Sequence, residues 1–488
     1  MKKISWVFLS LLLAVCMLVP AAVSCAEDTA GQAVVTIDNI RDFVVGIDEP
    51  VTLKDGTSRP LINFDNAATT PALKPVMEEV NEKLLMYGSI GRGFSLKSDF
   101  STGIYENTRD KVLSFVGLNP KDLTYTMFYA NNTTDGLNKL ATALINDKSD
   151  IVLATRMEHH ANDLPWRERC SAVGSKVIYA EVDAQGRIIY EDLERQLKEN
   201  NVKYVTVTAA SNVTGYMPDV HRIAKMAHQY GAMIIVDGAQ IVAHRAFSML
   251  GETPEENIDF FVFSAHKMYS PYGGGAVVGL NSIISGHQPA FYGGGTVHLV
   301  RDSIVDYKEG AEVYEAGSPN FPGVVGMGRA IDLLQQVGFD SIAEHEQKLV
   351  RRMIDGLLAI ENVTVYGDTE NLEDRVGVVT FNTSDANSLE LASRMSDYGG
   401  IATRRGAFCA HPYVWRLMGY ADDEMESFEG CTDFKTPGMI RVSFGIYNTE
   451  EEVDTFLEVL REQIEWIKQH NKELDAKELW DDVMFPEY

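Results

Sequence analysis

Short runs rich in β-branched and aromatic residues alternate with helical stretches through the middle of the chain, and this alternation most constrains the fold. The runs lie at 150–154, 202–207, 232–236 and 260–263. Unbroken apolar strands are typical of a sheet that is buried on both faces. Residues 220–230, between two of the runs, have a helical pattern that ends before a glycine. The alternation predicts an α/β fold with a mostly parallel sheet between helices.

The pattern changes near residue 325. Two long amphipathic stretches, 326–337 and 341–360, come before alternating strands such as 377–381 and 440–444. Because helices and strands are here segregated, we expect a smaller α+β arrangement after the α/β part.

These patterns divide the chain into predicted parts. We expect a large domain over 61–325 and a small C-terminal domain over 326–488. Residues 27–60 are expected to form an N-terminal segment that packs on the small domain. Residues 1–26 are assigned to an export signal.

The first 26 residues have the order of charge, apolar stretch and small residues that is typical of a secretory signal. Two lysines at positions 2 and 3 precede an apolar stretch over 6–19, and small residues follow at 21–26. Two alternatives stay open: residues 4–23 are nearly long enough to remain as a membrane anchor, and Cys25 is a candidate lipid-accepting cysteine. Each of these predicts export to the periplasm or cell envelope.

The overall charge argues against one class of partner. The chain has 43 Lys and Arg against 70 Asp and Glu, a formal net charge of −27. Such a surface repels a phosphate backbone, so we expect no nucleic-acid partner. The five cysteines show no CxxC spacing, so no metal site is predicted.

Polar side chains gather where the predicted strands end. Ligands of open parallel sheets bind beyond the carboxyl ends of the strands. An amine, a carboxylate, an imidazole and two amides are therefore expected at one edge of the sheet. These residues are Asn212, Asp237, Gln240, His266 and Lys267, and the hydroxyl of Ser264 lies in the same stretch as His266 and Lys267.

Cys409 lies in a glycine-containing loop with Arg404 and Arg405 close by in the sequence. Positive neighbours lower the pKa of a thiol and increase its thiolate fraction. On local sequence alone, an inert structural cysteine and a reactive one both remain open.

The strand-end residues resemble the cofactor site of a known family. The segments 237–240 and 264–267 are similar to the pyridoxal-phosphate site of class V aminotransferases, with the closest likeness to group II cysteine desulfurases and selenocysteine lyases. The resemblance extends from Phe64 to Glu451. Its other blocks lie at 64–69, 132–138, 157–162, 315–320 and 404–410.

The resemblance implies a fold-type I pyridoxal-phosphate enzyme with defined roles around the ring. Lys267 would hold the cofactor covalently, and Asp237 would keep the pyridine nitrogen protonated. Gln240 would donate a hydrogen bond to the phenolic oxygen, and His159 would stack on the ring.

The resemblance also implies a phosphate site and a substrate site. The phosphate would be bound by Thr133 and Thr134 at a helix N-terminus, by Ser264 and His266, and by Ser318 of a second subunit in a homodimer. The carboxylate of an amino acid substrate would be bound by Asn212, Arg404 and Arg441.

Cys409 stands at the position of the desulfurase nucleophile. The implied reaction removes sulfur from L-cysteine, giving alanine and a persulfide on Cys409 that passes to a sulfur-acceptor protein. Transamination, epimerisation or another carbon–sulfur cleavage are the alternatives that keep the cofactor. A catalytically silent protein that binds through the same fold is a third hypothesis.

Three features depart from the family pattern, one of them the replacement of family histidines by Gly91 and Ser95. Ala407 and Phe408 stand where the family usually has histidines, and the stretch 410–440 is longer than expected. We expect this insert to alter the entrance of the site or to change the substrate. In an oxidising compartment its Cys431 is a candidate disulfide partner for Cys409.

Overall fold

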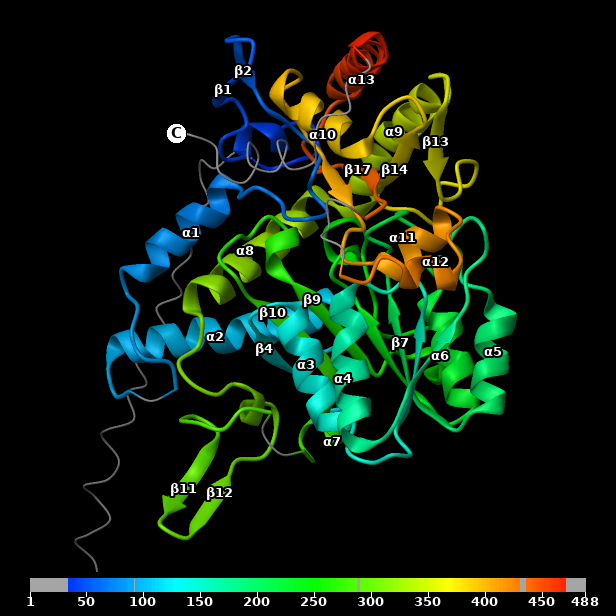
Figure 1. Ribbon diagram of the computed structural model, residues 1–488. Coiled ribbons are helices and arrows are strands. Elements are labelled where there is room, and N and C mark those ends of the chain that lie inside the picture. The colour runs from blue at the N-terminus through cyan, green and yellow to red at the C-terminus, as the bar shows by residue number, and fades with distance from the viewer. Residues whose placement is uncertain (1–33, 92, 288–289, 431–435, 471–488) are drawn as a thin grey trace, which may run out of the picture. The chain divides into compact units, whose positions relative to one another are not determined.

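The computed structural model describes residues 34–91, 93–287, 290–430 and 436–470 (Figure 1). The predicted signal at 1–26, with Cys25, and the cysteine of the insert, Cys431, lie outside these residues. The described residues from Val35 onward belong to one compact unit. No helix in these ranges combines the length and apolarity needed to cross a bilayer.

A seven-stranded sheet forms the centre of the fold, with the order β4-β10-β9-β8-β7-β5-β6. Within it, β10 runs antiparallel to both of its neighbours, whereas the pairs from β9 to β6 are parallel. The predicted α/β fold with a mostly parallel sheet is therefore confirmed. The strands are β4 (Tyr125–Ala130), β5 (Ile151–Thr155), β6 (Val177–Ala180), β7 (Val202–Thr208), β8 (Met233–Asp237), β9 (Phe260–Ser264) and β10 (Gly275–Leu280).

Helices cover both faces of this sheet. On one face lie α3 (Thr133–Leu144) and α4 (Leu164–Val173) (Figure 1). They share a hydrophobic cluster with strand side chains such as Ile235 and Val262. The alternate side chains of the same strands face a second cluster that includes α6 (Val220–Gln229) and α8 (Phe321–Val337). Apolar side chains on both faces of each strand explain the unbroken apolar runs of the sequence.

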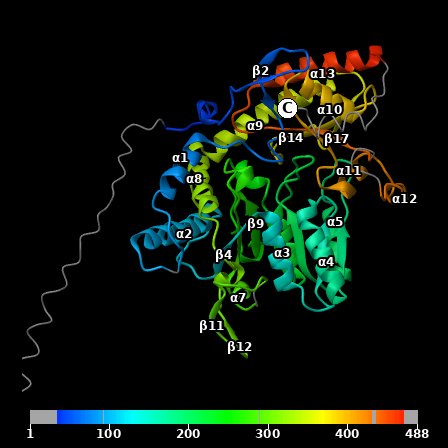
Figure 2. The same ribbon diagram turned by 60° about the vertical axis from the view of Figure 1, so that its left-hand side comes forward.

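A four-stranded antiparallel sheet, β13-β14-β17-β16, lies at one end of the first sheet in both views (Figures 1 and 2). Its core includes Leu349, Phe381 and Phe456. Helix α8 packs with the first sheet, whereas α9 packs mainly with this core. The predicted domain boundary at 325/326 stays a prediction. The elements are β13 (Val363–Tyr366), β14 (Val378–Thr383), β16 (Arg404–Gly406), β17 (Met439–Ser443), α9 (Phe339–Leu358), α10 (Ser388–Asp397) and α13 (Glu450–His470).

The N-terminal segment contacts both parts of the molecule. Val35, Ile40 and Val44 belong to the large hydrophobic cluster, whereas the amide of Lys54 donates to Asp397 O in α10. The remaining helices and strands are η1 (Ile40–Phe43), β1 (Pro50–Thr52), β2 (Ser58–Pro60), β3 (Ile62–Asn63), α1 (Lys74–Leu84), α2 (Leu96–Phe115), η2 (His160–Asn162), α5 (Tyr190–Glu199), η3 (Ile241–Ala243), η4 (Pro254–Glu256), η5 (Ala265–Lys267), α7 (Asn281–Ile284), β11 (Val297–Arg301), β12 (Ile304–Tyr307), η6 (Ala311–Tyr314), β15 (Ile401–Ala402), α11 (His411–Leu417) and α12 (Asp422–Glu426).

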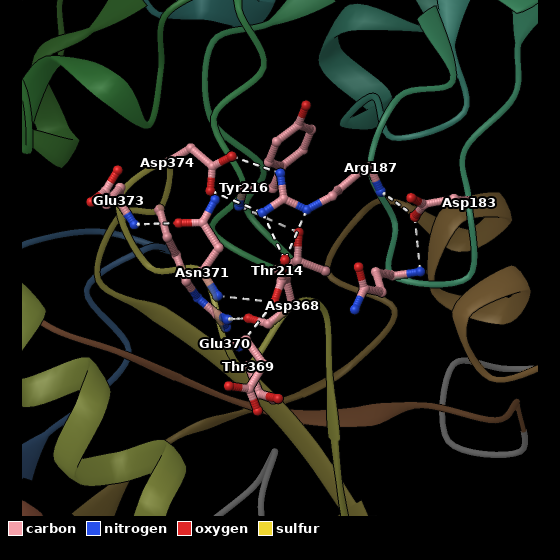
Figure 3. Close-up of polar contacts among 12 residues, drawn as sticks. Asp183, Arg187, Thr214, Tyr216, Asp368, Thr369, Glu370, Asn371, Glu373 and Asp374 are labelled. Carbon is pink, nitrogen blue, oxygen red and sulfur yellow. Dashed lines mark hydrogen bonds and ion pairs between the residues drawn. The ribbon is translucent and has the colours of Figure 1, made fainter.

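An ionic cluster joins the turn before α5 to the loop between β13 and β14 (Figure 3). Arg187 donates to both carboxylate oxygens of Asp374, at 2.6 and 3.0 Å, and to Asp368 at 3.1 Å. Its guanidinium lies 4.9 Å from the ring centroid of Tyr216. Planar, bidentate pairs of this kind are stronger than single ion pairs because two hydrogen bonds share one geometry.

Replacing Arg187 with Gln is expected to lower the free energy of unfolding by about 1–3 kcal/mol, because two partly buried carboxylates lose their donor. Urea unfolding measures the effect. Arg195 is the matched control, since it also contacts two carboxylates, Asp192 and Glu199, but its side chain is 50% exposed. Arg195→Gln should change the free energy of unfolding by no more than about 0.5 kcal/mol. Equal effects of the two substitutions would contradict this ranking.

Candidate active site

A cavity of about 440 Å³ lies at the edge of the large sheet where the parallel strands end. The predicted strands 232–236 and 260–263 end one residue too early. Asp237 and Ser264 are the last residues of β8 and β9 rather than the first residues after them. Of the sequence-predicted site residues, the following line the cavity: Thr133, Thr134, His159, Asn212, Asp237, Gln240, Ser264, His266, Lys267, Arg404, Cys409 and Arg441.

Lys267 and Asp237 place two ionisable groups at the cavity, the Asp237 side chain buried and Lys267 half-buried. Burial lowers the pKa of the Lys267 amine to about 8, because a desolvated ammonium is costly. Burial also raises the pKa of Asp237, whose carboxylate accepts a hydrogen bond from the amide of Ala239 at 2.9 Å. Glycine is required at position 238, between Asp237 and Ala239, because a Cβ there would lie 2.0 Å from Cζ of Phe261.

His159 is held as a neutral ring. Its Nδ1 accepts a hydrogen bond from the amide of Ala161 at 3.0 Å, which leaves the ring proton on Nε2. Burial, followed by the positive charge of Lys267, lowers the pKa of His159 to about 3. An uncharged imidazole at the cavity wall is suited to stacking on a flat ring.

The N-terminus of α3 faces the same cavity. Asn132 caps the helix by accepting from the amide of Asp135, and the amide of Thr133 donates to Ser264 Oγ at 2.7 Å. Among the described residues, no hydrogen bond takes up the amide of Thr134. This free donor and the hydroxyls of Thr133, Thr134 and Ser264 are suited to an anion.

Gln240 and His266 complete the wall of the cavity. Nε2 of Gln240 donates to Ala67 O at 3.0 Å, which fixes the amide and leaves its second N–H for another acceptor. The ring of His266 contacts Thr69 through Nδ1 at 3.2 Å. Burial lowers the pKa of His266 to about 4, so this ring is also neutral at pH 7.

Arg441 is buried and only partly satisfied. Its guanidinium donates to Asn212 O at 3.0 Å and to Asp65 Oδ1 at 3.0 Å, whereas its buried Nε has no partner in the described part of the chain. Arg404 lies 3.8 Å from the same carboxylate and is exposed. A carboxylate ligand would therefore meet two guanidinium groups that already share Asp65.

The loop that carries Cys409 is fixed by backbone contacts with the large sheet. Nδ2 of Asn212 donates to Phe408 O at 2.7 Å, and the amide of His160 donates to Cys409 O at 2.7 Å. Phe408 and Cys409 both have left-handed backbones, with φ of 53° and 54°. Such a conformation is costly for residues other than glycine, so the surrounding contacts must hold it. The result is an exposed Cys409 thiol at the wall of the cavity.

Comparison with known proteins agrees with this arrangement. Residues 62–456 match the model of the family described as Aminotransferase class-V. The chain belongs to the class-V aminotransferase family. A probable cysteine desulfurase of Halalkalibacterium halodurans is 32% identical over 86% of this chain and 96% of its own length. A second one, of Pyrococcus abyssi, is 33% identical over 84% and 96%. The apo structure of a cysteine desulfurase from Thermococcus onnurineus superposes with a TM-score of 0.77 at 30% identity, over 89% and 99% of the two chains.

One residue that the family resemblance assigned to the site lies elsewhere in this single chain. Ser318 lines a neighbouring cavity of about 170 Å³, and Asn131 lines both cavities. The expected contribution of Ser318 from a second subunit stays a prediction. Among the described residues of the insert, 410–430 and 436–440, none lines the main cavity, so its effect on the entrance also stays a prediction.

Sequence reasoning missed two contacts of this class-V site. Asp65 was not assigned a role, yet its carboxylate joins Arg441 and Arg404. Asn212 was assigned to the substrate, whereas its amide nitrogen here holds the cysteine loop. The block 64–69 drew attention to Asp65, but no sequence pattern indicated that it contacts a residue 376 positions away.

Proposed function

We propose that this class-V aminotransferase family member is a pyridoxal-phosphate-dependent cysteine desulfurase. The observation that carries the proposal is the combination, in one cavity, of the desolvated Lys267 amine with the exposed Cys409 thiol. The relatives named above, which match nearly their whole length, support the same activity.

The residues of the cavity fit pyridoxal phosphate. The Lys267 amine has no hydrogen bond or ion pair among the described residues, and a desolvated amine is a good nucleophile toward an aldehyde. Asp237 has the charge to pair with a pyridinium nitrogen, and the free amide of Thr134 suits a phosphate oxygen. His159 would lie against the ring, and Gln240 would donate to its phenolic oxygen.

The reaction that we propose is redox-neutral overall. L-Cysteine and the Cys409 thiol give alanine and a Cys409 persulfide. Bound pyridoxal phosphate supplies an electron sink for the pair of electrons left on the substrate carbon. Cys409 Sγ forms a bond to the substrate sulfur as the carbon–sulfur bond breaks, and Nζ of Lys267 takes up and returns protons at the substrate carbons. Arg441 and Arg404 orient the substrate carboxylate.

The wider assembly is also a proposal. A second copy of the chain would contribute Ser318 to the phosphate site, and a sulfur-acceptor protein would take the persulfide sulfur from the exposed Cys409. A transaminase or epimerase of the same family would need neither the Cys409 thiol nor the acceptor protein. A requirement for this thiol therefore distinguishes a desulfurase from these enzymes.

Lys267 should take up pyridoxal phosphate with a pH dependence set by its low pKa. Only the neutral amine attacks the aldehyde, so the rate of uptake should rise with pH and level off above about pH 8. Stopped-flow absorbance measures this rate. Borohydride should then fix the cofactor to Lys267, as detected by peptide mass spectrometry. An adduct on another lysine, or a rate that still rises near pH 10.5, would contradict the assignment.

Cys409→Ser removes the group that accepts sulfur and leaves the cofactor site intact. Alanine production from L-cysteine should fall by at least about 10³-fold, as expected for loss of a nucleophile, whereas cofactor absorbance should remain. Cys170→Ala is the control, because Cys170 is buried away from the cavity and its loss should leave activity in place. Full activity of Cys409→Ser under reducing conditions would exclude the desulfurase mechanism in favour of another class-V reaction.

Export through residues 1–26 remains our proposal for localisation. Replacing Leu11 and Leu12 with Arg interrupts the apolar stretch and should leave the full-length protein in the cytoplasm. Thr29→Arg, beyond the stretch, should be exported as the unchanged chain is. Cell fractionation with an antibody against the protein distinguishes the two. A cytoplasmic location of the unchanged chain, with residues 1–26 still attached, would reject the proposal.

A further inference from the structure

Asp65 is a charged residue beside the cavity that has no role in the proposed chemistry. It lies two residues after β3, and its carboxylate contacts both arginines of the predicted substrate site. Oδ1 accepts a hydrogen bond from Nη2 of Arg441 at 3.0 Å, and Oδ2 lies 3.8 Å from Nη1 of Arg404. Each oxygen faces a different guanidinium group, so one carboxylate bridges two cations.

The backbone of Asp65 is fixed to the strand that carries Arg441. Asp65 forms an isolated parallel bridge with Ser443, the last residue of β17. The amide of Ser443 donates to Phe64 O at 2.7 Å, and its hydroxyl accepts from the amide of Ala67 at 2.8 Å. The bridge between the carboxylate and the arginines therefore starts from a backbone that is held on both sides of Asp65.

Arg441 is held by the protein but keeps a donor that is not used. Its Cζ lies 5.0 Å from the ring centroid of Phe408. Nη1 donates to Asn212 O and Nη2 to Asp65, whereas the buried Nε has no partner among the residues that the structure describes. Arg441 and Arg404 line the cavity, and Asp65 does not. A ligand in the cavity therefore contacts the guanidinium groups and meets Asp65 only through its charge.

The three side chains leave one net positive charge at this part of the cavity, which matches the single α-carboxylate of an amino acid. A second acidic group on the ligand would add a negative charge that these groups do not balance, and Asp65 would repel it. The side chains of Arg441 and Asp65 are only 3% and 21% exposed, so water and salt screen this repulsion incompletely. Lys267 and Asp237, the other charged residues of the wall, are assigned to the cofactor.

The side chain of the ligand is directed toward the same charges. In the proposed function the substrate sulfur meets the Cys409 thiol, and Cys409 follows Arg404 by five positions, in the loop after β16. Both residues line the cavity. An acidic group in place of the substrate thiol would therefore come close to Arg404 and to its partner, Asp65.

We propose that Asp65 is a specificity-determining residue: by bridging Arg441 and Arg404, it restricts the site to amino acids with an uncharged side chain and disfavours those with an acidic one. The inference rests on the proposed function and deepens it, because it names the substrate class of the same site. L-Cysteine belongs to this class at neutral pH, since a free thiol has a pKa of about 8.5.

L-Aspartate and L-asparagine test this selection, because their side chains have nearly the same shape and differ by one negative charge. Isothermal titration calorimetry measures their dissociation constants on the full chain loaded with pyridoxal phosphate. The unchanged protein should bind L-asparagine more tightly than L-aspartate. Asp65→Asn removes the repelling charge and should shift the ratio of the two constants toward L-aspartate by about tenfold or more.

Two control variants separate charge from structure. Asp65→Glu keeps the carboxylate and should keep the ratio of the unchanged protein. Asp374→Asn also removes a carboxylate that accepts from a guanidinium group, that of Arg187, but outside the cavity, and should leave the ratio unchanged. If Asp65 had only a structural role, Asp65→Asn would weaken the binding of both ligands alike.

Arg404→Gln tests the same balance of charges from the opposite side. It removes one positive charge, so the ratio should shift toward L-asparagine by about threefold, a smaller change because the side chain of Arg404 is 56% exposed. At an exposed position the substitution is compatible with folding. This variant decides the question if circular dichroism shows that Asp65→Asn does not fold.

An unchanged ratio in Asp65→Asn, or in Arg404→Gln where the first variant does not fold, would overturn the inference. A shift as large in Asp65→Glu as in Asp65→Asn would also overturn it. So would binding of L-alanine without binding of either test amino acid, because shape rather than charge would then limit the side chain. If the loaded protein binds no amino acid, L-alanine included, the proposed function is rejected, and this inference with it.

Discussion

The site depends on holding the Lys267 amine and the Asp237 carboxylate at one cavity, with no ion pair between them in the described part of the chain. Each group is costly to bury, and burial shifts the pKa of both toward the neutral form. The strands β8 and β9 position the two groups: Asp237 is the last residue of β8, and Lys267 lies in η5, which directly follows β9. A ligand with a positively charged group for the Asp237 carboxylate, and with a group that reacts with the Lys267 amine, would compensate the cost of desolvating both.

The second half of the site is brought to this edge from the other sheet. Phe408 and Cys409 follow β16, yet their carbonyl groups accept hydrogen bonds from Asn212, in the loop after β7, and from His160, the first residue of η2 after β5. These contacts hold a backbone conformation that the two side chains disfavour. The ion pair between Asp65 and Arg441 joins the two regions in the same place. The thiol position is thus a consequence of packing between the sheets rather than of the loop sequence.

Much of the fold followed from the amino-acid pattern, and so did part of the site. The apolar runs located β5, β7, β8 and β9 to within one or two residues, because a strand buried on both faces tolerates few polar side chains. Ser318 differs. The sequence identifies the block 315–320 that contains it, but its expected place in the phosphate site depends on a second subunit, and within one chain it lines the smaller cavity. The contacts of Asp65 were also beyond the sequence, since they join positions that are hundreds of residues apart.

The sequence by itself determined the α/β architecture and the set of polar residues at the strand ends. Hydrophobic periodicity is read from short stretches of sequence, and the carboxyl ends of parallel strands meet at one edge of the sheet. Only the tertiary structure decided that Asn212 holds the cysteine loop and that Arg441 already shares Asp65 with Arg404. The physical reason is that hydrogen-bond partners and pKa shifts depend on distance and desolvation in three dimensions, and neither is encoded by spacing along the chain.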